Sequence, residues 1–409
     1  MLRVASFTHE YPPFALGGTG THVEELVQGL KKFDCETHVF SYAEDSSASN
    51  YNNDATAHFV TNGLNGSAPA ARTLTEVNAK GAAAAAETYP TEQGPHIVHC
   101  HNCLAYGAAE ATKELFRIPL VSTVHALFKT IYERLGTPGS EEILRSEAAS
   151  CQGSDYLITV SKAMLEDIHS HYHIPLDRIR VIYNGFDLSR FVAEASDTLL
   201  RERLRQELAS QGEPLVVFAG RVDPIKGVSA LLHSAALVIK KMPKVKYIIA
   251  GDNTSSYARH IMSLAQRLGL YAPRFTFAGK LSRSKLATLY SIADLAVVPS
   301  IYEPFGYSAI EAMVFGVPVV ASNTGGLSEI IEDGKNGLLV PVMKVNRSWN
   351  VDEHALADSQ LALIADSAYR AKLGLTGRQR VYRRFQLEPM IVSTYSVYRE
   401  IASREALHG

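Results

Sequence analysis

The sequence has no long hydrophobic run and very little net charge. No stretch approaches the roughly 18 consecutive apolar residues of a membrane-spanning helix. The formal net charge of −2 at pH 7 provides no general basic field that would attract nucleic acid or acidic lipid. The first apolar run stops at His9-Glu10, too early for a secretory signal. We therefore expect a cytoplasmic protein that binds no nucleic acid and contacts membranes at most peripherally.

Cysteine is also scarce, with four residues in 409. Cys100 and Cys103 form a C-x-x-C motif, but a structural zinc site usually needs a second pair of ligands, and Cys35 and Cys151 stand alone. The other cluster of metal-binding residue types alternates along a helix end that we expect to be exposed: His169, His171 and His173. We therefore predict that the protein holds no metal and no cofactor.

Short apolar runs alternate with helical patterns in two successive blocks. Apolar residues make up 46% and charged residues 20% of the chain, a globular balance, and 409 residues suffice for two domains. The expected strands lie at 2–7, 37–42, 97–101, 120–124, 156–160 and 181–183, and then at 215–219, 246–250, 275–277, 295–298 and 317–321. This alternation predicts an α/β protein with two doubly wound parallel sheets and a cleft between them. We place the boundary near Phe191, so that the first domain spans 1–190 and the second 191–387.

A strand–helix–strand segment near the end of the second block carries two carboxylates eight positions apart. Glu303 lies in the loop after an apolar strand, and Glu311 lies in the second turn of the helix that follows Pro304-Phe305-Gly306. Ligands bind at the carboxyl ends of parallel strands. A carboxylate can accept two hydroxyls of a polyol, and the amides at the helix start favour an anion. The pattern suits a sugar nucleotide, although two solvated glutamates at helix ends would look the same.

Glycines and cations mark two other strand ends. Gly17-Gly18-Thr19-Gly20 separates the first strand from a helix expected over Thr21–Lys32, a geometry that suits an anion. The spacing misses the dinucleotide fingerprint because Val23 stands where the third glycine would be. Arg221 and Lys226 follow the first strand of the second block. Two cations there suit a pyrophosphate, although most such residues are ordinary surface cations.

Together these motifs resemble those of the retaining GT-B nucleotide-sugar glycosyltransferases, glycosyltransferase family 4. Four motifs occur in the family's order: Gly17-Gly18-x-Gly20, Gly220-Arg221-x4-Lys226-Gly227, Glu303-x7-Glu311 and Gly325-Gly326. The resemblance covers nearly the whole chain. It implies two Rossmann-like domains, an acceptor domain and a donor domain, with the final helix 388–409 crossing back onto the first domain.

The resemblance also implies a role for each matching position. Arg221 and Lys226 would hold the donor diphosphate and stabilise the departing nucleotide. Glu311 would grip the ribose hydroxyls, whereas Glu303 and His125 would lie at the donor sugar. The catalytic positions are then Glu303, Arg221, Lys226 and His125. The donor-binding positions are Gly18, Arg221, Lys226, Leu281, Glu303, Phe305, Gly306, Tyr307, Glu311, Gly325 and Gly326.

Several residues depart from the family pattern or narrow it. His125 is followed by Ala126-Leu127, where an acidic residue is common, and Phe385 is followed by Gln386-Leu387, where an aromatic pair is usual. No lysine stands near Gly17-Gly18, which argues against the bacterial starch-synthase type. The opening looks like bacterial maltose-1-phosphate or glycogen-type members. The Val-His-x-His strand of the family fits residues 98–101, which makes the cysteines incidental.

The expected function is therefore retaining transfer of a hexosyl group from a nucleotide-diphosphate sugar, above all a UDP-sugar, to a hydroxyl acceptor. No two aspartates stand two residues apart, so the Asp-x-Asp grip on a divalent metal is missing and we predict metal independence. The alternatives are a nucleotide-sugar 2-epimerase of the same fold and a non-catalytic sugar-nucleotide binding protein. A nicotinamide oxidoreductase is disfavoured by the glycine spacing.

Acceptor residues are expected on loops of the first domain, at 11–16, 102–107 and 126–139. The candidates there are Tyr106, Phe128, Lys129, Tyr132 and Arg134. A plain surface helix explains these residues equally well, and we favour that interpretation. The oligomeric state does not follow from the sequence.

Overall fold

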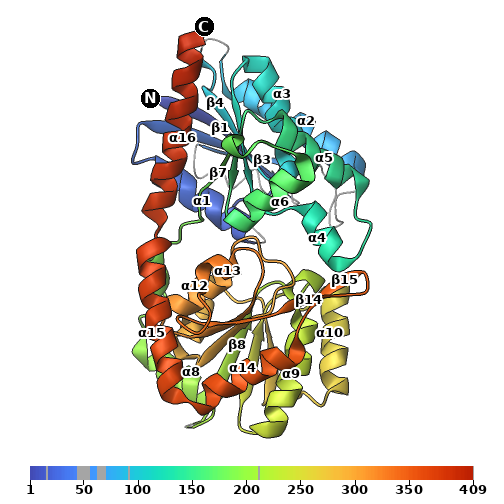
Figure 1. Ribbon diagram of the computed structural model, residues 1–409. Coiled ribbons are helices and arrows are strands. Elements are labelled where there is room, and N and C mark those ends of the chain that lie inside the picture. Colours follow the sequence, from blue (N-terminus) through green and yellow to red (C-terminus); the bar gives the residue numbers. More distant parts are fainter. Residues whose placement is uncertain (15–16, 44–55, 62–70, 91–92, 211, 409) are drawn as a thin grey trace. The chain divides into compact units, whose positions relative to one another are not determined.

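The computed structural model describes residues 1–14, 17–43, 56–61, 71–90, 93–210 and 212–408. Its contacts divide the chain into two compact units, which are described separately. The first unit comprises Met1–Lys129, Gly139–Phe186 and Leu387–Gly409, and the second comprises Thr130–Pro138 and Asp187–Gln386. Figure 1 shows the elements of both. The predicted functional domains, with a boundary near Phe191, stay a prediction.

The first unit is built on a seven-stranded parallel sheet. Its strands are β1 (Leu2–Thr8), β2 (Cys35–Ala43), β3 (Ala57–Thr61), β4 (Ile97–His101), β5 (Leu120–Val124), β6 (Tyr156–Thr159) and β7 (Ile179–Val181). Their order across the sheet is β3-β2-β1-β4-β5-β6-β7. Strands β2 and β3 therefore follow β1 toward one edge of the sheet, whereas β4 to β7 lie on the other side of β1 and extend toward the opposite edge. In open parallel sheets, such a switch point is where ligands bind.

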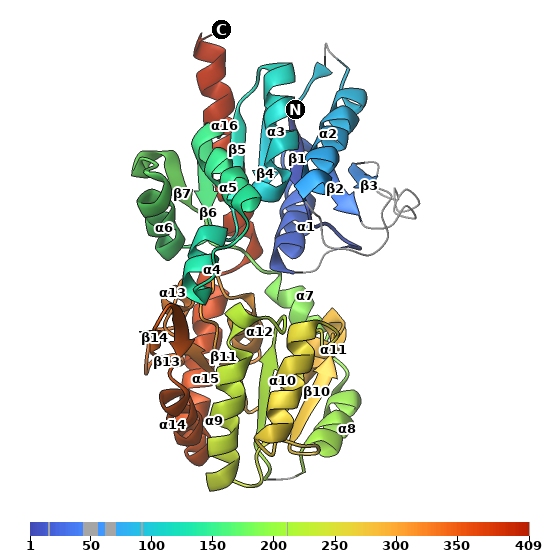
Figure 2. The same cartoon turned by 90° about the vertical axis from the view of Figure 1, so that its right-hand side faces the viewer.

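Helices cover both faces of this sheet (Figure 2). They are α1 (Gly18–Leu30), α2 (Ala71–Thr88), α3 (Tyr106–Phe116), α5 (Glu141–Gly153), α6 (Lys162–Tyr172) and α16 (Leu387–His408), with short 3-10 turns η3 (Cys103–Ala105) and η4 (Leu176–Arg178). Successive strand residues point to opposite faces. Val4 and Ile97 thus pack under α1 and α16, whereas Ala5 and Val98 pack under α2 and α3.

One sequence expectation in this unit needs correction. Helix α1 begins at Gly18 rather than at Thr21, because the backbone is extended only as far as Gly17. In the C-x-x-C motif, Cys100 lies within β4 and Cys103 opens η3, which leads directly into α3. All four cysteines are free and buried, and burial raises the pKa of Cys35 to about 11 and that of Cys100 to about 12. Both are therefore packed thiols at neutral pH.

Helix α4 (Phe128–Leu135) is shared between the units. Its first two residues belong to the first unit, and the segment Thr130–Pro138 belongs to the second. The guanidinium of Arg134 stacks over the Trp349 ring, with 4.0 Å between the guanidinium carbon and the ring centroid. The sequence favoured a plain surface helix for this segment, and that interpretation stays a prediction; the structure adds the contact of Arg134 with Trp349.

The second unit contains a six-stranded parallel sheet and a separate hairpin. The strands are β8 (Leu215–Ala219), β9 (Lys246–Ala250), β10 (Phe275–Gly279), β11 (Leu295–Val298), β12 (Val319–Ser322) and β13 (Leu338–Val340), and the hairpin pairs β14 (Val342–Val345) with β15 (Ser348–Val351). The order in the sheet is β10-β9-β8-β11-β12-β13, so its switch point lies between β8 and β11. Strand β10 runs two residues further than expected, and β12 begins two residues later.

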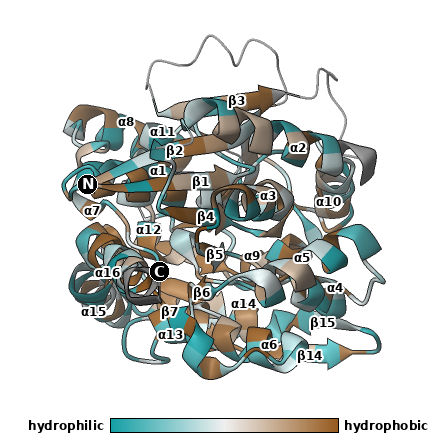
Figure 3. Cartoon of the chain, turned by 90° about the horizontal axis from the view of Figure 1, so that it is seen from above, coloured by the Kyte–Doolittle hydropathy of each residue, from teal (hydrophilic) through white to brown (hydrophobic). Residues whose placement is uncertain are grey.

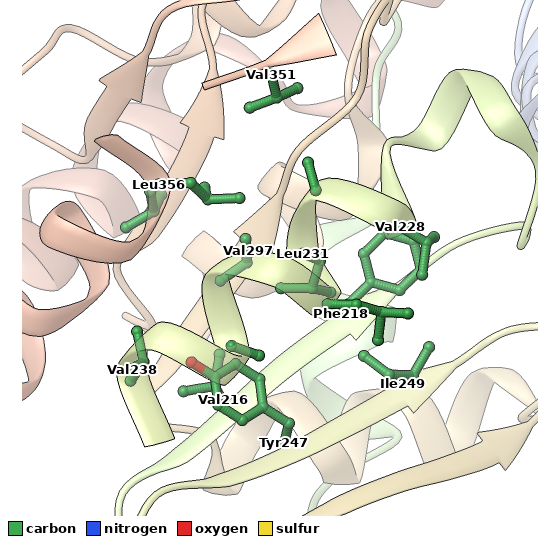
Figure 4. Close-up of a cluster of buried hydrophobic side chains, with 14 of the residues drawn as sticks. Val216, Phe218, Val228, Leu231, Val238, Tyr247, Ile249, Val297, Val351 and Leu356 are labelled. Atoms are coloured by element: carbon green, nitrogen blue, oxygen red, sulfur yellow. The ribbon is translucent and has the colours of Figure 1, made fainter. Parts of the chain in front are cut away.

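The helices of the second unit again lie on both faces of the sheet. They are α7 (Leu188–Ala193), α8 (Thr198–Leu208), α9 (Val228–Lys241), α10 (Ser256–Arg267), α11 (Arg283–Ile292), α12 (Tyr307–Val314), α13 (Leu327–Ile330), α14 (Glu353–Ala365) and α15 (Ser367–Arg384), with a 3-10 turn η5 (Pro224–Lys226). Val216, Phe218 and Val297 of the sheet form one core with Leu231 of α9 and Leu356 of α14 (Figure 4).

The apolar interior of both units follows from these patterns. In Figure 3 strand β4 is largely brown, the colour of hydrophobic residues, whereas the outer helices carry teal, hydrophilic faces. Some polar groups in the core are paired with one another. For example, the Tyr247 hydroxyl bonds Gln360 Oε1 at 2.8 Å, and Gln360 Nε2 bonds Ser234 Oγ at 3.1 Å. Among the described residues, no helix is both long enough and apolar enough to cross a membrane.

The final helix is joined to the central strand β4 by a buried histidine. His99 Nδ1 lies 2.5 Å from the Tyr398 hydroxyl of α16, and His99 Nε2 lies 2.7 Å from Thr123 Oγ1 of β5. Burial lowers the pKa of His99 to about 3, so the ring is neutral. A neutral imidazole has one N–H and one lone pair, and this position uses both.

We predict that Tyr398→Phe lowers the free energy of unfolding by about 1–3 kcal/mol, because His99 Nδ1 would lose its partner inside the core. Urea unfolding of the full chain measures the change. Tyr395→Phe on the same helix is the matched control, since its ring packs on Phe33 at a centroid distance of 4.8 Å. Equal stability of the Tyr398→Phe variant and the wild type would contradict the prediction.

Candidate active site

The switch point of the second sheet brings two loops into backbone contact. The loop after β8 carries Arg221 and Lys226, and the loop after β11 carries Glu303. The Ile301 amide donates to the Ile225 carbonyl at 2.8 Å. Gly227 adopts a φ of +66°, and a Cβ added there would stand 1.8 Å from the Pro299 carbonyl oxygen. Only glycine permits so close an approach of the two loops.

This contact places Lys226 against Glu303. Lys226 Nζ lies 2.7 Å from Glu303 Oε2, and the two side chains are 19% and 10% exposed. Ser300 Oγ donates to the same carboxylate oxygen at 2.9 Å. A largely buried ion pair of this kind loses most of its rotational freedom, so the ammonium has a defined position at the carboxyl end of the sheet.

Arg221 lies on the same loop but is more exposed. One guanidinium nitrogen, Nη2, is 3.2 Å from Asp223 Oδ2, and the Arg221 side chain is 61% exposed. Asp223 also caps η5, since its Oδ1 accepts from the Lys226 amide at 3.2 Å. The other guanidinium donors form a fork that suits a pair of phosphate oxygens.

The predicted glycine pair supports the Glu303 loop from the next strand. Gly325 adopts a φ of +50°, and a Cβ there would stand 2.1 Å from the Glu303 carbonyl oxygen. A Cβ on Gly326 would stand 2.4 Å from the Phe305 carbonyl oxygen. The Gly326 amide donates to the Glu303 carbonyl at 2.9 Å. These glycines are thus required for packing against the loop, whatever ligand the loop binds.

Helix α12 begins beside this loop. Gly306 precedes it with a φ of +124°, and a Cβ there would stand 2.9 Å from Leu327 Cδ2. The Phe305 ring is buried, with its centroid 5.7 Å from that of Phe385 and 5.3 Å from that of Tyr307. Phe305 therefore offers a ligand its backbone rather than its ring.

Glu311 lies one turn further along α12, where burial raises the pKa of its carboxyl to about 7 and the Arg283 guanidinium opposes this shift. Leu281 is half-buried and follows β10, at the far end of the same strand edge. The structure therefore brings Lys226, Glu303 and the Gly325-Gly326 pair together, with Arg221 on the adjoining loop. Among the described residues, no hydrogen bond or ion pair joins Glu311 or Leu281 to that group.

His125 and Gly18 belong to the first unit, at the edge where β1 and β4 end. Gly18 is exposed and opens α1. The preceding amide, that of Gly17, donates to Glu10 Oε2 at 3.0 Å, so a carboxylate already lies at this helix start. His125 is buried, and its amide donates to Asn102 Oδ1 at 2.9 Å.

Sequence reasoning missed three residues around His125. His101 Nδ1 lies 3.1 Å from His125 Nε2, and the His22 and His125 ring centroids are 4.5 Å apart. Asn102, with φ 68° and ψ 158°, adopts a conformation that is rare for any residue but glycine. The Val-His-x-His pattern could have indicated His101, but no sequence signal reveals the backbone conformation of Asn102.

The segment after His125 is held by a buried carboxylate. Glu147 of α5 accepts from the amides of Phe128 and Lys129, the latter at 3.1 Å, and from the Tyr172 hydroxyl. Burial raises the pKa of Glu147, although these hydrogen bonds oppose the shift. Phe128 and Lys129, which were acceptor candidates, thus form the capped start of α4.

Comparisons with known proteins agree with this architecture. Residues 16–190 match the family model described as Glycosyltransferase Family 4, and residues 201–380 match that of Glycosyl transferases group 1. The alpha-maltose-1-phosphate synthase of Mycolicibacterium smegmatis is 30% identical over 98% of this chain and 100% of its own. The D-inositol 3-phosphate glycosyltransferase of Xylanimonas cellulosilytica is 31% identical over 78% of this chain and 75% of its own.

Solved structures share the fold over almost the whole chain. The sucrose-phosphate synthase of Thermosynechococcus elongatus has a TM-score of 0.82 and 27% identity, covering 99% of this chain and 100% of that one. The Anabaena protein HepE, in complex with UDP and glucose, has a TM-score of 0.79 and 22% identity, covering 98% of this chain and 100% of that one. The two Rossmann-like sheets and these neighbours define a GT-B fold. The chain belongs to the group 1 glycosyltransferases.

We predict that Gly325→Ala destabilises the protein by about 1–3 kcal/mol and lowers turnover, because the new Cβ must displace the Glu303 backbone. Gly269→Ala is the matched control. Gly269 also has a positive φ, +72°, but a Cβ there meets nothing within 4 Å. Thermal unfolding and an activity assay of both variants measure the difference. The prediction fails if the two variants are equally stable and equally active.

We predict that Glu311→Gln stabilises the protein by roughly 1–3 kcal/mol at pH 8 and much less near pH 4.5. In the unfolded chain the Glu311 carboxyl has its ordinary pKa of 4.5, so it loses its proton above that pH. In the folded protein its pKa is raised to about 7, so the carboxyl keeps its proton up to that pH. Stability therefore falls as pH rises between these values, and the loss is complete above them.

Glutamine removes this penalty, so the gain should grow over that pH window. Denaturant unfolding of the wild type and variant across pH 4 to 9 tests the slope. The exposed Glu202→Gln on α8 is the control. A gain that does not change with pH would contradict the assignment.

Proposed function

We propose that this glycosyltransferase transfers a hexosyl group, with retention of the anomeric configuration, from a nucleotide-diphosphate sugar to a hydroxyl acceptor. A UDP-sugar is the proposed donor, and no metal takes part in the proposed reaction. The observation that carries the proposal is the ammonium of Lys226, held 2.7 Å from Glu303 at the switch point of the second sheet, with Arg221 on the same loop.

The charges of the reaction suit these residues. Cleavage of the bond between the anomeric carbon and the diphosphate oxygen leaves negative charge on the diphosphate and positive charge on the sugar. Lys226 and Arg221 stabilise the diphosphate, and the carboxylate of Glu303 lies beside the sugar. Fixed charges aimed at groups that become charged in the transition state usually contribute the largest part of catalysis.

Glu303 is better suited to orient the donor than to attack it. One of its oxygens already accepts from both Lys226 and Ser300. The acceptor hydroxyl therefore attacks from the face that the diphosphate leaves, and its proton passes to a phosphate oxygen of the leaving group. The new bond forms on the same face, so the configuration is retained.

The donor proposal has support from the comparisons as well as from the chemistry of the site. Anabaena HepE, which has the same fold, has been crystallised with UDP-glucose. Glu311 offers a carboxylate for the ribose hydroxyls, and the Gly279–Leu281 backbone lies at the same strand edge for the base. These roles, the role of Gly18 and His125, and the cytoplasmic location stay predictions.

We predict that Lys226→Ala lowers kcat by about 10²–10³-fold, as removal of one transition-state donor does. Steady-state kinetics with a UDP-sugar donor measure the effect. Lys241→Ala is the control, since that lysine is 65% exposed and lies 3.8 Å from Asp358 on the surface of the second unit. Near-normal turnover of Lys226→Ala would remove this residue from the mechanism.

Three further assays test metal dependence, the reaction class and the stereochemistry. Transfer should continue in EDTA, and loss of activity that magnesium or manganese restores would refute metal independence. With donor alone, a transferase at most hydrolyses it slowly, whereas an epimerase would change its sugar. NMR of the product's anomeric proton distinguishes retention from inversion.

A further inference from the structure

Three histidines from separate elements of the first unit converge in its core. His22 lies in α1, His101 ends β4, and His125 follows β5. One ring nitrogen from each lies within 4.8 Å of those of the other two. His101 Nδ1 and His125 Nε2 are 3.1 Å apart, and the ring centroids of His22 and His101 are 5.6 Å apart.

The rings are buried, with exposed fractions of 4% for His22, 0% for His101 and 8% for His125. Burial lowers the pKa of His22 to about 4 and the pKa values of His101 and His125 well below the usual range. All three imidazoles are therefore neutral at pH 7, and a neutral imidazole keeps the lone pair that a metal needs.

Hydrogen bonding within the first unit leaves part of this cluster unsatisfied. His101 Nε2 and His22 Nδ1 are buried and have no partner with good hydrogen-bond geometry among the described residues, although the Asn184 side chain lies near His22 and opposes the lowering of its pKa. A buried nitrogen without a partner carries the full cost of its lost hydration. Folded proteins keep few such atoms, and coordination of a metal ion would relieve this cost.

We propose that His22, His101 and His125 form a binding site for one divalent transition metal of the zinc class. Imidazole nitrogen is a favoured ligand of zinc, copper and nickel, whereas magnesium and calcium require oxygen ligands. Tetrahedral zinc with bonds of about 2.0–2.1 Å places its ligand atoms roughly 3.4 Å apart. One ring nitrogen of each histidine lies within 4.8 Å of the other two, so modest side-chain rotation brings the three to that spacing. Three protein ligands leave the fourth position for water or an added ligand.

The site goes beyond the proposed reaction, which uses no metal. A bound ion would engage the lone pair of His125, a predicted catalytic residue, and would hold its ring against His101. Zinc should therefore inhibit transfer. This consequence depends on the predicted role of His125, whereas metal binding itself does not, so the two can fail separately.

The binding experiment uses the full chain, produced without a histidine tag and freed of metal with EDTA. Cobalt(II) is titrated in, and the visible absorption of tetrahedral cobalt is followed. We expect one cobalt per chain, displaced by one zinc. His22→Asn and His101→Asn should each weaken cobalt binding at least about 100-fold, since each removes a ligand. Circular dichroism of each variant confirms its fold.

The matched control replaces the exposed cluster at the end of α6, with His169, His171 and His173 all changed to alanine. This variant should keep the cobalt spectrum of the wild type. The proposal is overturned if wild-type protein shows no tetrahedral cobalt, if the His22 and His101 variants keep the spectrum, or if only the α6 variant loses it. In these cases the cluster consists of packed aromatic rings alone.

If a variant does not fold, X-ray absorption of the zinc-loaded wild type identifies the metal ligands without any substitution. Three imidazole ligands are expected, and fewer imidazoles or a sulfur shell would refute the site. The activity assay then adds zinc to the wild type. Inhibition at the zinc concentration that displaces cobalt is expected. Binding without inhibition would reject the predicted role of His125 and leave the metal site standing.

Discussion

The ion pair between Lys226 and Glu303 sets the geometry of the ligand edge in the second unit. It forms because two loops, one after each strand of the switch point, approach through a backbone hydrogen bond and through Gly227, where any side chain would collide with Pro299. Removing either partner would leave a mostly buried charge unpaired. The cation that we assign to the leaving diphosphate is therefore positioned before any ligand arrives, as electrostatic preorganisation requires.

In the first unit, the carboxyl-end edge of the sheet is stabilised by Tyr398, a residue near the end of the chain. Strand β4 presents His101 at its carboxyl end, and two residues earlier His99 is bonded to Tyr398 of α16. Thr123 of β5 holds the other nitrogen of His99. The last helix thus stabilises the strand that carries the histidine cluster, although it contributes no residue to that cluster.

The sequence predicted the architecture well and the local geometry less well. The alternation of apolar strands and amphipathic helices located both parallel sheets, and the position of Lys226 and Glu303 after strands of one sheet indicated that they share an edge. That they form an ion pair depends on strand order, β8 beside β11, which no local pattern reveals. Gly325 was predicted to bind the donor, and that role stays a prediction; steric contact with the Glu303 backbone is a separate reason for glycine at this position.

The histidine cluster could not be predicted because its members come from three elements far apart in the chain. His125 alone was proposed as a functional residue, from a resemblance rather than from its surroundings. His22 and His101 become relevant only when β1, β4 and β5 are adjacent, and their neutral state follows from burial, which a sequence does not show. The conformation of Asn102 similarly exists only in the folded chain.

The assignment of Thr130–Pro138 to the second unit has a consequence for the design of truncated fragments. The chain passes from one unit to the other at residues 129–130, 138–139, 186–187 and 386–387. A single cut therefore yields no complete half: a fragment that begins at Asp187 would expose the Trp349 ring that Arg134 covers. Chimaeras that exchange the second unit between relatives should carry the short α4 segment with it.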